Sequence, residues 1–82
     1  MKTTARTIRR VDPVWLNREI GKRLREQRTK AGLSLAQVGI GLGVSRSCVN
    51  NWELGRAQLN WNLTQLYNLA LFYGVDVRRL TP

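Results

Sequence analysis

Helix start and stop signals follow one another closely along this chain, and they constrain its fold more than any other feature. Each predicted helix begins at a residue whose side chain suits an N-cap, and glycine marks the predicted ends. The predicted starts are Asp12-Pro13, Ser34, Ser45 and Asn62, and the predicted stops are Gly32, Gly55 and Gly74. Asp76 is expected to cap a last turn that ends near Leu80. These signals predict an all-α chain, a compact bundle of four to five helices without a strand.

Apolar residues with helical spacing agree with these boundaries. Leu16, Ile20 and Leu24 lie four residues apart in the first predicted helix, so they form one stripe along it. The last long helix has a similar stripe, formed by Leu63, Leu66, Leu69, Ala70 and Tyr73. Arg28 continues the first stripe toward the core, where a charge needs a partner.

Residues 33–44, LSLAQVGIGLGV, allow three interpretations. Apolar residues alternate with glycines in the second half, a period of two that is typical of a strand. The glycines also resemble a phosphate-binding loop, but their spacing is G-x-G-x-G, and no Gly-Lys-Ser/Thr follows. A strand here would have no good partner strand elsewhere in the sequence. We therefore predict a helix from about Leu35, capped by Ser34, with Gly39 at a place where another helix can approach closely.

Basic residues greatly outnumber acidic ones. The chain of 82 residues has 14 Lys and Arg against 5 Asp and Glu, a formal charge of +9, and a pI of about 11.4. Such an excess favours polyanionic partners, although it also agrees with a basic surface that serves solubility. No basic amphipathic helix with a large apolar face stands out, so we expect a nucleic acid rather than a membrane as the partner.

The cysteine and histidine content narrows the chemistry. Cys48 is a single cysteine, which excludes an internal disulfide framework, and the chain has no histidine. We therefore expect no metal site and no cofactor, and we interpret Cys48 as a small core residue. No nucleophile-base pair or carboxylate pair suggests an enzyme. The apolar stretches are too short to cross a bilayer and no secretion signal is evident, so we expect a cytoplasmic protein.

The first residues differ from the rest of the chain. Residues 1–11 are polar and basic and contain no acid, which predicts a flexible N-terminal arm. Arg6, Arg9 and Arg10 are its candidate contacts to a nucleic acid. Residues 12–82 are expected to form one domain.

The segment from Ser45 to Gly55 combines an apolar face with a polar face. At roughly 100° per residue, one side of this helix carries Cys48, Val49 and Trp52. The other side carries the hydrogen-bonding residues Arg46, Ser47, Asn50 and Asn51. The helix follows its short predecessor through Gly43-Val44-Ser45, an arrangement typical of a helix-turn-helix. Arginine suits a bidentate contact with guanine in the major groove of DNA, and asparagine suits one with adenine.

Three motifs together resemble one known family. LSLAQVG, LGVSRSCVNNWELG and LALFYGVDVRRL occur in the order and spacing of the Cro/phage-repressor (XRE-type) helix-turn-helix family, across Ile20–Leu80. The resemblance implies a lambda-repressor-like DNA-binding domain whose recognition helix, residues 45–54, enters the major groove. It also implies a sequence-specific transcription regulator, a repressor or autoregulator of phage or mobile-element type. Such a regulator binds palindromic double-stranded operator DNA as a homodimer.

The resemblance also assigns roles to individual residues. The base-reading positions of the family fall on Arg46, Ser47 and Asn51, and Asn50 serves a base or the neighbouring phosphate. The candidate contacts to the DNA backbone are Ser34, Gln37, Ser45, Arg56, Asn60 and Asn62. One departure is Leu35, which stands where the family often has a glutamine that contacts DNA. Gln37 lies two positions later, and the departure concerns one interaction with DNA rather than the fold.

An ion pair is implied as well. In this family a basic residue late in the first helix commonly pairs with the glutamate of W-E-x-G. The corresponding residues here are Arg28 and Glu53, which helical spacing also places at the edge of the core. The resemblance thus supplies the partner that Arg28 needs.

Surplus apolar residues near the C-terminus suggest a protein interface. A homodimer interface is expected among Tyr67, Leu71, Phe72, Val77 and Leu80, which also suit a place in the core. The alternative function is an antitoxin or adaptor whose main role is to bind a protein partner, such as a toxin, through the fourth helix and the C-terminus.

Overall fold

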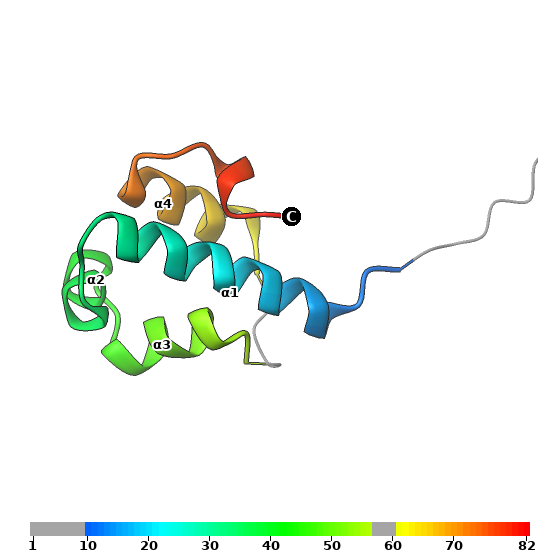
Figure 1. Ribbon diagram of the computed structural model, residues 1–82, viewed down its shortest axis with the longest axis horizontal. Coiled ribbons are helices and arrows are strands. Elements are labelled where there is room, and N and C mark those ends of the chain that lie inside the picture. Colours follow the sequence, from blue (N-terminus) through cyan, green and yellow to red (C-terminus); the bar gives the residue numbers. More distant parts are fainter. Residues whose placement is uncertain (1–9, 57–60) are drawn as a thin grey trace, which may run out of the picture.

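The chain folds into short helices around one long helix. The computed structural model describes residues 10–56 and 61–82 (Figure 1). In chain order the elements are α1 (Pro13–Lys30), α2 (Leu35–Leu42), α3 (Arg46–Leu54), α4 (Leu63–Tyr73) and the 3-10 helix η1 (Val77–Arg79). The described residues contain no strand, so the all-α prediction is confirmed. Residues 35–42 form a helix, which excludes the strand and the phosphate loop as interpretations of that segment.

The long helix α1 has neighbours on both sides. In Figure 1, α3 runs along one side of α1, while α4 and η1 lie along the other side. The short helix α2 lies beyond the C-terminal end of α1, where the chain turns back toward α3 (Figure 1). This arrangement makes α1 the support on which the other elements are placed.

The helix boundaries follow the capping signals. Side-chain oxygens of Asp12, Ser34, Ser45, Asn62 and Asp76 accept hydrogen bonds from the backbone N–H groups of the turns that they begin. Glycines in the left-handed conformation follow the helices, with φ of 70° at Gly32, 72° at Gly43, 67° at Gly55 and 68° at Gly74. Since glycine adopts this conformation without steric cost, each helix ends where its sequence specifies.

The core joins α1 to the C-terminal part of the chain. Its buried residues are Ile20, Leu24, Leu66, Leu69, Ala70 and Leu80. Trp52 and Trp61 pack at the edge of this core, with ring centroids 5.6 Å apart. Leu80 has an exposed fraction of 0%, so its predicted place on a dimer interface is wrong. The residues after η1 return to the core, and Leu80 fills it instead of lying on the surface.

The backbones of α1 and α3 approach each other closely at Gly21. A Cβ atom at Gly21 would lie 2.5 Å from the carbonyl oxygen of Glu53 and 2.6 Å from that of Trp52. A second close approach lies at Gly55, where a Cβ would lie 2.8 Å from the Cα of Arg18. Because neither position has room for a side chain, the two helices pack backbone to backbone over the C-terminal half of α3.

Candidate nucleic-acid interface

The helix α3 presents a polar face to solvent. Its side chains Arg46, Ser47 and Asn51 are exposed, and Asn50 is half-buried. On the opposite side, Val49 is 2% exposed and holds the helix against the rest of the protein. Cys48 and Trp52 are half-buried on that side. The structure therefore has the two faces that helical spacing predicts, with Asn50 at the boundary between them.

A tight turn joins α2 to α3. Gly43 ends α2 in the left-handed conformation, and the Ser45 hydroxyl then accepts a hydrogen bond of 3.0 Å from the backbone N–H of Cys48. Gly39 faces this turn, since a Cβ there would lie 2.7 Å from the carbonyl oxygen of Val44. The sequence predicts a close approach at Gly39, and the backbone of the turn makes it. The angle between α2 and α3 is thereby set by backbone contacts.

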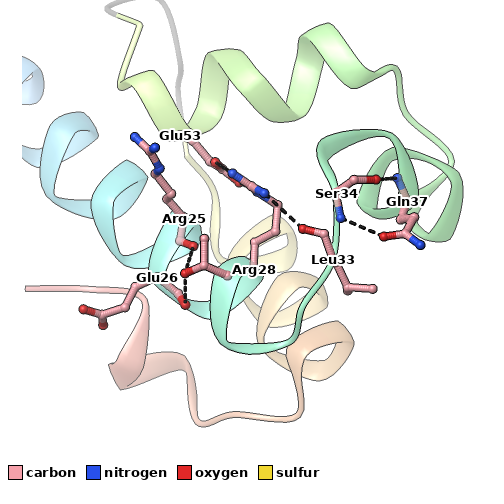
Figure 2. A network of polar contacts seen from close by, with 8 residues as sticks. Arg25, Glu26, Arg28, Leu33, Ser34, Gln37 and Glu53 are labelled. Carbon is pink, nitrogen blue, oxygen red and sulfur yellow. Dashed lines mark hydrogen bonds and ion pairs between the residues drawn. The ribbon is translucent and has the colours of Figure 1, made fainter.

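An ion pair fastens the far end of α3 to α1 (Figure 2). The Arg28 guanidinium donates from Nε to Oε2 of Glu53 at 2.7 Å and from Nη2 to Oε1 at 2.9 Å. A third donor, Nη1, reaches the carbonyl oxygen of Leu33 at 3.0 Å. The side chains of Arg28 and Glu53 are only 14% and 5% exposed. Arg28 and Glu53 thus form the ion pair that the sequence predicts, and Arg28 also fixes the segment that leads into α2.

The electrostatic surroundings of this ion pair extend to α4. The hydrogen bond to Glu53 raises the pKa of Arg28 above its ordinary value, which favours the charged form. Burial, together with the negative charge of Glu53, raises the pKa of Tyr73 to about 12. Tyr73 therefore stays neutral to a higher pH than an ordinary tyrosine, which keeps a negative phenolate away from Glu53.

The start of α2 carries a reciprocal pair of hydrogen bonds (Figure 2). The Ser34 hydroxyl accepts from the backbone N–H of Gln37 at 3.1 Å, while Oε1 of Gln37 accepts from the backbone N–H of Ser34 at 2.7 Å. This capping box orients the Gln37 amide so that its nitrogen is directed away from Ser34. Gln37 is exposed, whereas Leu35 is half-buried. The amide donor nearest the start of α2 is therefore that of Gln37.

The structure describes some of the remaining candidates for contacts to the DNA backbone. Arg56 and Asn62 are exposed, and the Asn62 side chain caps α4 by accepting from the backbone N–H of Gln65 at 2.8 Å. Arg10 is exposed at the start of the described chain. The candidates Arg6, Arg9 and Asn60 lie outside the described residues.

The polar face of α3 has an exposed arginine at each end and no unpaired acidic residue on its own helix. Glu53, the acidic residue of α3, is neutralised by Arg28. Arg46 and Arg56, at the two ends of α3, are both exposed. A polyanion that approaches α3 thus meets cations and neutral hydrogen-bonding groups.

Two features of this site were missed by the sequence reasoning. The close approach at Gly21 has a weak signal, namely one glycine inside a helix that is otherwise continuous. The capping box at α2 has a clear one, because Ser34 and Gln37 have the spacing S-x-x-Q. Asn62 and Gln65 have the matching spacing at the start of α4, but there only the Asn62 half of the pair is formed within the described residues.

Comparison with known protein families identifies the family of this chain. The model of a family described as helix-turn-helix domain matches residues 19–81. The chain belongs to this family. As a helix-turn-helix domain, it uses α2 and α3 as the two defining helices, and its polar face is the outward side of the second one.

Solved structures share the fold of this helix-turn-helix domain. The crystal structure of the DNA-binding domain of BldD is 32% identical, has a TM-score of 0.74, and aligns over 84% of this chain and 97% of that one. Apo-HppE is 27% identical, has a TM-score of 0.76, and aligns over 82% of this chain and 36% of that one. The hydroxypropylphosphonic acid epoxidase from S. wedmorenis gives the same identity and TM-score, with 82% and 35% covered. The chain thus spans about a third of the HppE and epoxidase chains. No curated protein sequence matches the chain.

Within residues 10–56 and 61–82, no helix has the length and apolar character needed to cross a membrane. In the same residues, no three potential metal-ligating side chains of His, Cys, Asp or Glu are grouped together.

Proposed function

We propose that this protein is a sequence-specific DNA-binding transcription regulator of the Cro/phage-repressor (XRE-type) class. It acts as a repressor or autoregulator in the cytoplasm, has no enzymatic activity, and binds a palindromic operator as a homodimer. The observation that carries the proposal is the exposed face of α3, where Arg46, Ser47 and Asn51 project from a helix whose other side is anchored by the buried Val49. Membership of the helix-turn-helix family and the similarity to the DNA-binding domain of BldD support it.

The proposed mechanism begins with placement of α3 in the major groove. A groove about 12 Å wide admits one α-helix. Arg46 donates two hydrogen bonds to guanine, and Asn51 makes a bidentate contact with adenine. Ser47 and the half-buried Asn50 contact a neighbouring base or phosphate. Each good bidentate pair is worth about 1–3 kcal/mol of discrimination against the wrong base.

Contacts to phosphates set the register of the complex. The N-terminal ends of α2 and α3 carry backbone N–H groups and a favourable helix dipole, which attract phosphate oxygens. Ser34, Gln37 and Ser45 lie at these two ends. Arg56 and Asn62 extend the contacts beyond α3, and their exposure permits it. These groups add affinity that falls with salt but carry no sequence information.

The test is selection of bound duplexes from a randomised pool at about physiological salt, where non-specific binding is weak. The wild-type protein is compared with Arg46→Ala and Asn51→Ala. A matched control is Arg79→Ala, which removes an equal charge from exposed η1 on the other side of α1 (Figure 1). We expect an enriched palindrome that the control retains and that each α3 variant relaxes at particular base pairs. Salt-sensitive binding without any enriched sequence would refute the proposal.

A further inference from the structure

The helix α4 has a second apolar face that the core does not cover. Leu63, Tyr67 and Leu71 follow one another at intervals of four residues, which aligns them along one side of the helix. Their exposed fractions are 71%, 54% and 79%. We call these three residues the α4 stripe. Large apolar side chains grouped in this way, rather than scattered singly, indicate an interaction surface.

The charge pattern limits what can cover the stripe. The sequence of α4, LTQLYNLALFY, contains no charged residue, although the whole chain carries a formal charge of +9. Two copies of so basic a protein repel each other over most of their surfaces. The stripe is a surface where they can meet without bringing like charges together. The neutrality of α4 therefore suits a second copy of this chain.

The surface beside the stripe is hollowed. A hollow of about 250 Å³ lies next to it, lined by Tyr67, Ala70, Leu71, Val75, Asp76 and Val77. The hollow and the protruding Leu71 thus belong to one patch. A twofold contact requires such a patch, because each copy must supply both the protruding side chain and the hollow that receives it.

The direction of the stripe is compatible with two copies on one duplex. On α4, the buried residues Leu66, Leu69 and Ala70 face α1, and the stripe is rotated from them by roughly 100° about the helix axis. The stripe therefore faces sideways from the stack of α1 and α4. A twofold axis beside it allows both α3 helices to lie on the same side of the dimer, as two half-sites require.

We propose that the α4 stripe binds the α4 stripe of a second copy of this chain. The two α4 helices pack antiparallel around a twofold axis, and Leu71 of each copy enters the hollow beside Tyr67 of the other. Phe72, a predicted interface residue, is half-buried, and its ring lies where a Cβ on Gly41 would be, so it serves the contact between α4 and α2 instead. The inference rests on the proposed function for its role, because the dimer is what reads two half-sites.

The first experiment measures the oligomeric state of the full chain without DNA by sedimentation equilibrium. Leu71→Lys places a charge in the centre of the contact, at a side chain too exposed to support the fold. Ile40→Lys is the matched control, since Ile40 is 83% exposed and lies on α2 rather than on the α4 stripe. We expect wild type and Ile40→Lys to dimerise and Leu71→Lys to remain monomeric, all with the same helical content by circular dichroism.

The second measurement separates the interface from DNA reading. The selected palindrome and a duplex with one half-site are titrated with wild type and Leu71→Lys. We expect Leu71→Lys to bind the palindrome about 10²-fold more weakly, because the linkage between two copies is lost. Its affinity for the single half-site should equal that of wild type.

The outcomes distinguish the two proposals. A wild-type protein that stays monomeric up to its solubility limit, or a Leu71→Lys variant that dimerises as wild type does, overturns the α4 interface even where half-site reading persists. In that case a different protein is the occupant to seek. Dimerisation that Leu71→Lys abolishes, in a protein that enriches no DNA sequence, supports the interface and refutes the proposed function.

Discussion

The two sides of α1 are held by different kinds of contact. Toward α3, the contacts are fixed in geometry: a bidentate ion pair between Arg28 and Glu53, and two places where backbones meet at glycine. Toward α4 and η1, the core is made of aliphatic side chains such as Leu66 and Leu69. Apolar packing stabilises but tolerates small shifts, whereas hydrogen bonds and backbone contacts specify position. Geometric precision is therefore concentrated on the side of α1 that carries the candidate interface.

Breaking the ion pair should have the largest effect on this comparison. Glu53→Gln keeps the shape of the side chain but leaves the charge of Arg28 without its partner, so we expect a loss of about 3–5 kcal/mol in the free energy of unfolding. Urea denaturation measures the loss. The control is Glu26→Gln, at an exposed position of α1, which should change stability by less than about 0.5 kcal/mol. Equal effects of the two substitutions would show that the pair does not fasten α3.

The close approach at Gly21 should come next. Gly21→Ala pushes a methyl group against the carbonyl oxygens of Glu53 and Trp52, and we expect a destabilisation of about 1–3 kcal/mol with weaker DNA binding. The control is Gly41→Ala, at a contact made by a side chain instead of by backbone. Its Cβ would lie 2.5 Å from the ring of Phe72, a side chain that can rotate away. A small change, offset by the better helix propensity of alanine, is expected there. The comparison fails if Gly41→Ala is the more damaging of the two.

A pH titration tests the contact between Tyr73 on α4 and the ion pair that joins α1 to α3. Tyr73 lies on α4, and its pKa is raised to about 12 by burial and by Glu53, so the folded protein prefers the neutral phenol. The stabilisation is fully present below the ordinary tyrosine pKa of 10.0 and is lost as the pH rises toward 12. Because Tyr73 is only half-buried and solvent screens part of the effect, we expect wild type to lose roughly 1 kcal/mol more stability than Tyr73→Phe between about pH 9 and pH 12. Parallel pH profiles of the two proteins would mean that Tyr73 does not report on this contact.

The smallest effect is expected at the helix starts. Gln37→Ala removes the return hydrogen bond of the α2 capping box and should cost about 0.5 kcal/mol. Gln65 has the same position in α4, where the described residues show no return bond, so Gln65→Ala should cost less. The melting temperatures of the two variants compare the N-terminal ends of α2 and α4 directly. A larger fall in melting temperature for Gln65→Ala than for Gln37→Ala would contradict the expected difference between α2 and α4.

Local signals explain why much of the fold is predictable from sequence. The caps at Asp12 and Ser45 act within one helical turn, so their consequences can be worked out from neighbouring residues alone. The assignment of Arg28 to Glu53 needed the family resemblance, because the two are 25 residues apart. The outward face of α3 followed from helical spacing, whereas its contacts with DNA stay predictions.

The errors lie where the tertiary arrangement decides. Leu80 and Leu71 are both leucines near the end of the chain, yet one is 0% and the other 79% exposed. Nothing local distinguishes them, since the exposure depends on how the segment after η1 returns to α1. The error at Leu63 has the opposite direction. Its helical spacing predicts a core residue, but it is 71% exposed, so that prediction is wrong. An apolar stripe alone does not reveal which of two possible faces a helix buries.

The left-handed glycines have a consequence for engineering. Because Ser45 starts α3 and Gly55 ends it, the limits of this helix do not depend on the residues that point outward between them. Arg46, Ser47 and Asn51 can therefore be exchanged as a set, while Val49 and Glu53 are kept to hold the helix in place. The segment is in this sense a replaceable part. Under the proposed function, a library limited to those three positions would sample new DNA specificities on an unchanged scaffold.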